Sequence, residues 1–351
     1  MIRKFIGFVL RRRLEDVIAT AVTLALLLLC LTTRLIRVFH IGMLDVLFIL
    51  LPIGVLGVKT LFSLLLSYGS DEENLDATKF VLGFFKPVAK IVRDWFPFIL
   101  LTACYYSLYS NFILRINPHL ADATLSKIDA AILGNQVCIL LEPFVRPGIT
   151  DFLNIIYFSH VIVFPGAALY FYLKGEEKAF RRIMMGFLTI LVMGMISYIL
   201  VPAVGPQTYL AGRYTEDLRG RSISHAVDYI MRNWNVSFDC FPSLHVAIPL
   251  LLTFYIRRYR PKWFIPMLAY VACMCCATLY LRYHYLIDVI AAFAFAPAAY
   301  FINDFALSRW PGEKIAASAR PPLDGSPHTQ PLAEPVKPAG PARPGPKFSG
   351  S

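Results

Sequence analysis

Eight long apolar stretches constrain the fold of this 351-residue chain more than any other feature. They lie at about 17–33, 42–66, 94–115, 150–174, 183–203, 243–257, 263–281 and 284–305. About 20 apolar residues in a helix cross the hydrocarbon core of a bilayer. Only 16% of the residues are charged and 57% are hydrophobic, which is too apolar for a soluble domain of this length. The sequence therefore predicts an all-α polytopic membrane protein with about eight transmembrane helices.

The segments between these stretches divide the chain into three parts. Residues 1–93 hold a basic flank and two extra spans, and residues 94–305 hold the other six. Residues 306–351 are rich in Pro, Gly and Ala with few large apolar side chains, so we expect a disordered tail. The segment 125–145 is apolar but interrupted by polar residues, which favours an interfacial or re-entrant segment over a span.

Basic residues alternate between the two sides of the predicted membrane. The formal net charge is +11, and most Lys and Arg lie in every second connecting segment. The positive-inside rule then places both termini in the cytoplasm and accounts for the charge without a nucleic-acid partner. The same topology puts the unusual polar segments of the last four spans on the extracytoplasmic (periplasmic or lumenal) face.

Two of these polar segments carry histidines where apolar helices begin. "FPSLH" (241–245) opens one helix, and His284 opens another with Asp288 four residues later, on one predicted helix face. A carboxylate that accepts from one ring nitrogen fixes the tautomer and makes the other nitrogen a better base or nucleophile. A His–Asp pair can also simply lower the cost of burying both groups. Two helix N-termini, a serine and nearby arginines favour a phosphate site.

Other polar groups have alternative interpretations. Asp151, Asn154, Tyr157 and His160 form a stripe on the fourth span, either a headgroup pocket or interhelical hydrogen bonds. The seven cysteines are scattered and indicate packed small side chains rather than a metal site.

"FPSLH", followed some forty residues later by "HYLID" (284–288), resembles the paired signatures of the type 2 phosphatidic acid phosphatase superfamily. Leu244 stands where that family usually has glycine, and Tyr285 follows the second histidine. Both variants resemble the inositol phosphorylceramide synthase branch, as do "IDAAILGNQ" (128–136) and "VPAVGPQTYL" (201–210). The resemblance covers about 94–305 and implies a six-helix membrane core of the lipid-phosphatase type.

The resemblance also implies roles for individual residues. His284 would attack phosphorus and form a phosphohistidine, Asp288 would orient it, and His245 would protonate the leaving oxygen. Ser243 and the backbone amides around Leu244 would hold phosphate oxygens. No metal or other cofactor is implied, because arginines and helix N-termini can balance the charge.

The sequence departs from the commoner phosphatases at their arginine clamp. The arginine six positions before the nucleophilic histidine is Thr278 here, and the serine before it is Ala277. We expect Arg282 and Arg213 to supply phosphate contacts instead, with Gln207 as a further donor. Arg219, Arg221 and Arg232 lie in the same outer loop.

These features predict an integral-membrane phosphoryl-transfer enzyme acting on a lipid phosphate or phospholipid. Water as the acceptor would make it a phosphatase, and an alcohol such as a ceramide would make it a headgroup transferase. The main alternative is a transporter or channel with a His/Asp proton relay, which predicts ionisable residues along the depth of several spans. A scaffold that kept the fold without the chemistry is a third possibility.

Overall fold

The computed structural model describes residues 12–33, 77–107, 112–218 and 238–311, with residue 220 and parts of 7–10 and 54–66. The predicted second span at 42–66 and the tail after 311 therefore lie largely outside the described residues.

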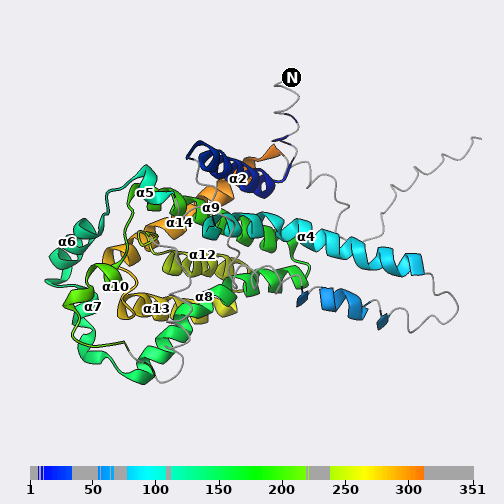
Figure 1. Cartoon of the computed structure of the whole chain (residues 1–351). Helices are drawn as coiled ribbons and strands as arrows, with labels where there is room; N and C mark the ends of the chain where they lie inside the picture. Colours follow the sequence, from blue (N-terminus) through cyan, green and yellow to red (C-terminus); the bar gives the residue numbers. More distant parts are fainter. Residues whose placement is uncertain are drawn as a thin grey trace, which may run out of the picture.

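Every regular element in the described ranges is a helix, which confirms the predicted all-α class (Figure 1). The long helices are α2 (Leu14–Thr33), α4 (Ala77–Ser107), α8 (Pro147–Leu173), α9 (Glu177–Leu200), α12 (Leu244–Tyr259), α13 (Phe264–Tyr280) and α14 (Leu286–Arg309). The short helices are α5 (Ile113–Ile116), α6 (Asp122–Leu133), α7 (Val137–Leu140) and α10 (Pro206–Tyr209), with 3-10 turns η2 (Glu142–Phe144), η3 (Ala211–Arg213) and η4 (Pro261–Trp263).

Four of the described segments are long and apolar enough to cross a membrane. They are Pro147–Leu173, Glu177–Leu200, Pro261–Tyr280 and Leu286–Arg309. Helix α12 has 16 residues, or about 24 Å of helix, which is shorter than the hydrocarbon core. The chain is thus an integral membrane protein by its apolar helices, while the count of eight spans and the six-helix core stay predictions. The predicted domain boundary after residue 93 falls inside α4.

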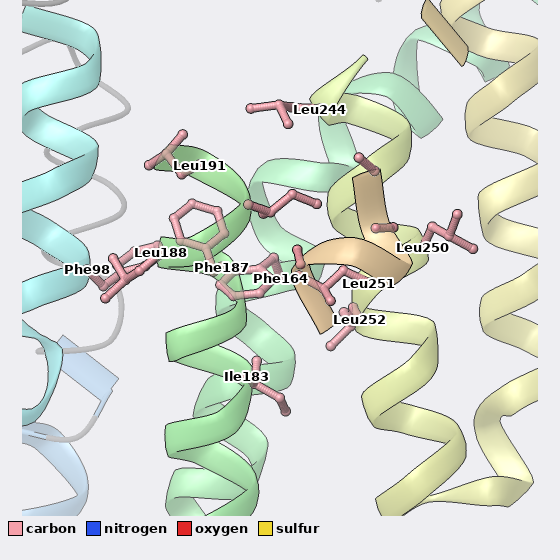
Figure 2. Packing of buried hydrophobic residues seen from close by; sticks show 14 of the residues in the cluster. Phe98, Phe164, Ile183, Phe187, Leu188, Leu191, Leu244, Leu250, Leu251 and Leu252 are labelled. Carbon is pink, nitrogen blue, oxygen red and sulfur yellow. The ribbon is translucent and has the colours of Figure 1, made fainter. Parts of the chain in front are cut away.

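Helix α9 lies at the centre of the bundle, as the burial of most of its side chains shows. It packs against α2, α4, α8, α12 and α14. Phe187 of α9 meets Phe98 of α4 and Phe164 of α8, with ring centroids 4.8 and 4.4 Å apart (Figure 2). In lipid, close van der Waals packing of this kind holds helices together, because the hydrophobic effect that drives soluble proteins to fold does not act between them.

The bundle has two different ends. Helices α12 and α14 begin where α9 and α13 finish, and the short helices α6, α7 and α10 gather there, at the left of Figure 1. We call this the histidine end, because His245 and His284 lie in it. We call the opposite end the basic end. Helix α9 begins there and carries Arg181 near its start, while α12 and α14 end there with Arg258 and Arg309 in their last turns.

Candidate active site

The start of α12 leaves a buried hydroxyl unused. Ser243 is the N-cap residue, and its side chain makes no capping hydrogen bond. Its Oγ is buried and has no hydrogen-bond partner within the described residues. Its backbone N–H donates to the carbonyl of Asp288 at 3.1 Å, which joins the starts of α12 and α14. An N-cap serine normally bonds the first turn of its own helix, so this hydroxyl is available to another group.

The turn between α13 and α14 fixes the second histidine. The N–H groups of Tyr283 and His284 both donate to the carbonyl of Thr278, at 3.0 and 3.2 Å. Arg282 sits in this turn with φ of +67°. Gly205 packs against it with φ of +85°, and a Cβ there would lie 2.8 Å from the carbonyl oxygen of Tyr283. Only glycine combines that conformation with that approach.

The hydrogen bonds of His284 determine its tautomer. Its Nδ1 lies 2.9 Å from the carbonyl oxygen of Cys240 and 3.4 Å from Oδ2 of Asp288. A carbonyl oxygen only accepts, so Nδ1 carries the proton and Nε2 of the neutral ring has a free lone pair. That Nε2 lies 3.2 Å from Nδ1 of His245. His284 thus presents an unprotonated nitrogen to a second histidine.

Asp288 is fully buried and collects three donors on one oxygen. Its Oδ2 accepts from the backbone N–H of Tyr285 at 2.8 Å and from the thiol of Cys240 at 3.0 Å, besides Nδ1 of His284. The sequence placed His284 and Asp288 on one helix face. Helix α14 instead begins at Leu286, so the two side chains meet across its N-terminus.

His245 is surrounded by side chains of α8. Its ring stacks on Tyr157 with centroids 4.4 Å apart, and His160 meets it edge-on at 4.5 Å. Tyr157 also stacks on Tyr283, at 4.4 Å. Two members of the predicted polar stripe therefore touch the histidine pair.

Three side chains could in principle hold a metal ion. The Sγ of Cys240, Nδ1 of His284 and Oδ2 of Asp288 all lie within 4.8 Å of one another. Each already belongs to the hydrogen bonds above. Burial raises the pKa of the Cys240 thiol well above its ordinary value, and the Asp288 carboxylate adds to the effect. The thiolate that a metal requires is therefore disfavoured.

Arg282, two residues before His284, is engaged by a network of its own. Its Nη2 donates to Glu142 at 3.0 Å and to the carbonyl of Glu216 at 2.7 Å, and its guanidinium lies 3.8 Å from the ring centre of Tyr214. Thr215 also donates to Glu142 through its N–H and its hydroxyl. The buried Nε of Arg282 has no hydrogen-bond partner within the described ranges.

The other predicted phosphate ligands lie farther out. Arg213 is exposed and donates to Asn135, while Gln207 is exposed and its N–H donates to the carbonyl of Arg282. No interaction of the described residues joins Arg213 or the Gln207 side chain to either histidine. Arg219, Arg221 and Arg232 lie outside the described residues.

Leu244 packs against α9, whereas the neighbouring His245 contacts α8. Leu244 is buried, and a Cβ added to Gly194 of α9 would lie 2.6 Å from its Cδ1. Figure 2 shows the side chain directed toward α9. Gly194 thus makes room for the leucine that stands where the resembled signature has glycine.

The sequence interpretation missed three residues at this site. Cys240 was assigned to packing, although its carbonyl and thiol bond His284 and Asp288. Asp122 and Asp129 of α6 contact the start of α14. The resemblance of segment 128–136 was the one signal that pointed to that helix.

These observations define a membrane protein with a His–His–Asp site at one end of its helices, in which His284 and Asp288 are buried and His245 is half-buried. The family model of the PAP2 superfamily matches residues 123–302, just over half of the chain. The chain belongs to the PAP2 superfamily. No curated protein and no solved structure matches it. Membership indicates an enzyme with phosphatase or phosphotransferase chemistry on phosphate esters, which favours this function over the transporter. It does not single out the inositol phosphorylceramide synthase branch.

Proposed function

We propose that this protein is a membrane phosphoryl-transfer enzyme that acts on a lipid phosphate or phospholipid through a phosphohistidine at His284. One observation carries the proposal: the carbonyl of Cys240 holds Nδ1 of His284, which leaves Nε2 unprotonated and facing His245. A nucleophile and a separate acid therefore lie in direct contact. Following the predicted topology, the reaction takes place at the extracytoplasmic face.

In the first step Nε2 of His284 forms a bond to phosphorus while the bond from phosphorus to the glycerol oxygen breaks. His245 gives its proton to that oxygen, and diacylglycerol leaves. The Asp288 carboxylate offsets the positive charge that develops on the His284 ring. In the second step a water or alcohol oxygen attacks phosphorus, its proton passes to His245, and the bond from phosphorus to Nε2 breaks.

The contact between the two rings implies movement before the first step. Phosphorus bonded to Nε2 of His284 cannot fit within the 3.2 Å that separates Nε2 from Nδ1 of His245. Since His284 is held by Cys240 and Asp288, His245 is the ring that turns. Besides its ring contacts with Tyr157 and His160, its Nδ1 lies 3.5 Å from the Tyr157 hydroxyl, so the turn breaks that long hydrogen bond together with the contact to His284.

Several donors without a partner in the described ranges lie in the same segments as the two histidines and are candidates for the phosphate oxygens. The Ser243 hydroxyl is buried and unpartnered among the described residues, and the first amides of α12 lack intrahelical acceptors. Arg282 keeps its Nε unpartnered while Glu142 takes one end of the guanidinium. We assign these groups to the phosphate, and we propose Arg213 and Gln207 for the outer headgroup because both are exposed.

The acceptor distinguishes a phosphatase from a transferase. Leu244, Tyr285 and the segments 128–136 and 201–210 support the inositol phosphorylceramide synthase-like branch, in which a lipid alcohol such as a ceramide receives the headgroup. The residues described above complete the reaction with no metal or other cofactor in the scheme.

The test is a panel of lipids with purified full-length protein in mixed micelles. Phosphatidate and phosphatidylinositol are supplied as substrates, each with and without ceramide. Free phosphate from phosphatidate indicates a phosphatase, and a new phosphodiester formed only with ceramide indicates a transferase. Absence of turnover of every lipid, in protein that is folded and monodisperse, would contradict the proposal.

A further inference from the structure

Helix α6 directs two carboxylates at the segment that carries His284 and Asp288. Asp122 and Asp129 lie seven residues apart and thus on one face of the helix. Each is only 1% exposed. Helix α6 contacts α14 and α10, and it lies at the histidine end in Figure 1.

Asp129 caps α14 from outside that helix. Its Oδ2 accepts from the N–H of Leu286 at 2.6 Å, and its Oδ1 accepts from the N–H of Ile287 at 3.0 Å. These are the first two residues of α14, and their N–H groups have no acceptor within the helix. Asp288 is the next residue, and its carboxylate accepts from the N–H of Tyr285. The two aspartates together therefore accept from three successive N–H groups at the start of α14.

Asp122 ties the same turn to the segment after α9. Its Oδ1 accepts from the hydroxyl of Tyr285 and from the N–H of Gly205, both at 2.9 Å. Its Oδ2 accepts from the N–H of Val204 at 3.0 Å. Tyr285 directly follows His284, so Asp122 fixes the residue between the nucleophile and the helix.

Neutral donors alone surround these two carboxylates. Among the described residues no Lys or Arg bonds either of them, whereas Glu142 nearby pairs with Arg282. Burial raises the pKa of Asp129 even though two N–H groups act against the rise. Apolar side chains would attach α6 to the bundle without the cost of burying two acids. Two buried acids at these positions therefore favour a role in orienting the start of α14.

We infer that Asp129 and Asp122 are positioning residues for phosphoryl transfer. They hold residues 284–288 so that Nε2 of His284 lies at the angle and distance the attack requires. This inference rests on the proposed function, because it assigns the positioned group to the nucleophile.

The test compares Asp129→Ala with Asp129→Asn in the full-length protein. Alanine removes both acceptors, and a displacement of the nucleophile of about 1 Å predicts a fall in kcat of about 100-fold at unchanged KM. Asparagine is a good capping residue with one acceptor oxygen, so we expect it to restore most of kcat. The substrate is [32P]phosphatidate or [32P]phosphatidylinositol, whichever is turned over faster in the panel above.

Two further variants separate positioning from folding. Lys127→Ala, on the exposed side of α6, should leave kcat unchanged. Tyr285→Phe removes one donor from Asp122 and should lower kcat by about threefold, the equivalent of one hydrogen bond. Hydrogen–deuterium exchange of Asp129→Ala should show faster exchange at Leu286 and Ile287 with the rest of α14 still protected.

The outcomes distinguish the inference from the function. Wild-type turnover with a normal kcat in Asp129→Ala overturns the inference alone. A fall in kcat that tracks lost folded protein, and that asparagine does not restore, also overturns it in favour of a structural role. An inactive wild-type protein overturns the proposed function and the positioning role together.

Discussion

The two ends of the bundle bury most of their carboxylates differently, the Glu142–Arg282 pair being an exception at the histidine end. At the basic end Glu15 bonds Arg181 at 2.9 Å, and Asp94 bonds Arg13 at 2.8 Å. At the histidine end Asp122, Asp129 and Asp288 accept from N–H, hydroxyl, thiol and imidazole groups. The first arrangement neutralises charge and fastens helices together. The second leaves negative charge beside His284, whose ring becomes positive in the reaction that we propose.

This contrast predicts that substitutions at the histidine end lower activity more than stability. His245→Ala should lower kcat on a lipid phosphate by about 10²- to 10⁴-fold, because the leaving alkoxide loses its acid. The loss should be much smaller with p-nitrophenyl phosphate, whose leaving group needs no proton. Steady-state kinetics with both substrates checks this, and an equal loss for both would show that His245 is not the acid.

At the basic end the opposite should hold. Arg181→Met leaves the buried Glu15 with only a longer contact to Arg13, at 3.7 Å, and should lower the free energy of unfolding by about 3 kcal/mol, the low end for a broken buried pair. The double variant Glu15→Leu/Arg181→Met should recover most of that loss, and kcat per folded molecule should stay near wild type. Thermal unfolding in detergent measures the first effect. A large fall in kcat would contradict the division between the two ends.

Gly194 links the helix core to the histidine end. Gly194→Ala drives a methyl group against Leu244 and should cost about 1–3 kcal/mol by overpacking. Leu244→Ala in the same chain should relieve the strain. Gly166→Ala in α8 is the matched control, since nothing lies within 4 Å of its Cβ position. Equal unfolding midpoints for the two glycine variants would show that Leu244 does not occupy that space.

Cys240 should give the smallest effect of the four substitutions in this comparison. Its raised pKa keeps the thiol neutral, and a neutral thiol donates to Asp288. Cys240→Ala should therefore lower kcat by about 3- to 10-fold, the equivalent of one hydrogen bond, while Cys240→Ser keeps a donor and stays near wild type. Equal kcat values for the alanine and serine variants would show that the hydrogen bond from the Cys240 thiol to Asp288 does not contribute to catalysis.

Local patterns in the sequence predicted the helices and the two histidine segments. The predicted span at 284–305 is close to α14, because apolar runs bounded by turn residues mark helices well. Helix α4 begins at Ala77, well before the predicted 94, and contains Pro87 and Pro97. The segment before residue 94 carries Lys86, Lys90 and Arg93, so the apolar pattern starts later than the helix itself.

Contacts between distant segments could not be predicted in this way. Asp129 lies 157 residues before Leu286, and no spacing rule links two such positions. The same holds for Arg282, which the turn at φ of +67° sends toward Glu142. A charge count near the motif could not show that this arginine already has an acidic partner.

Trapping the covalent intermediate tests the central claim most directly. Protein mixed with the [32P]-labelled lipid is quenched in base, where phosphohistidine survives, and the labelled peptide is located by mass spectrometry. The account predicts label on His284 in the wild-type protein and none in His284→Ala, with the variant still folded and inserted. Lipid turnover with label on another residue, or undiminished turnover in His284→Ala, would contradict it.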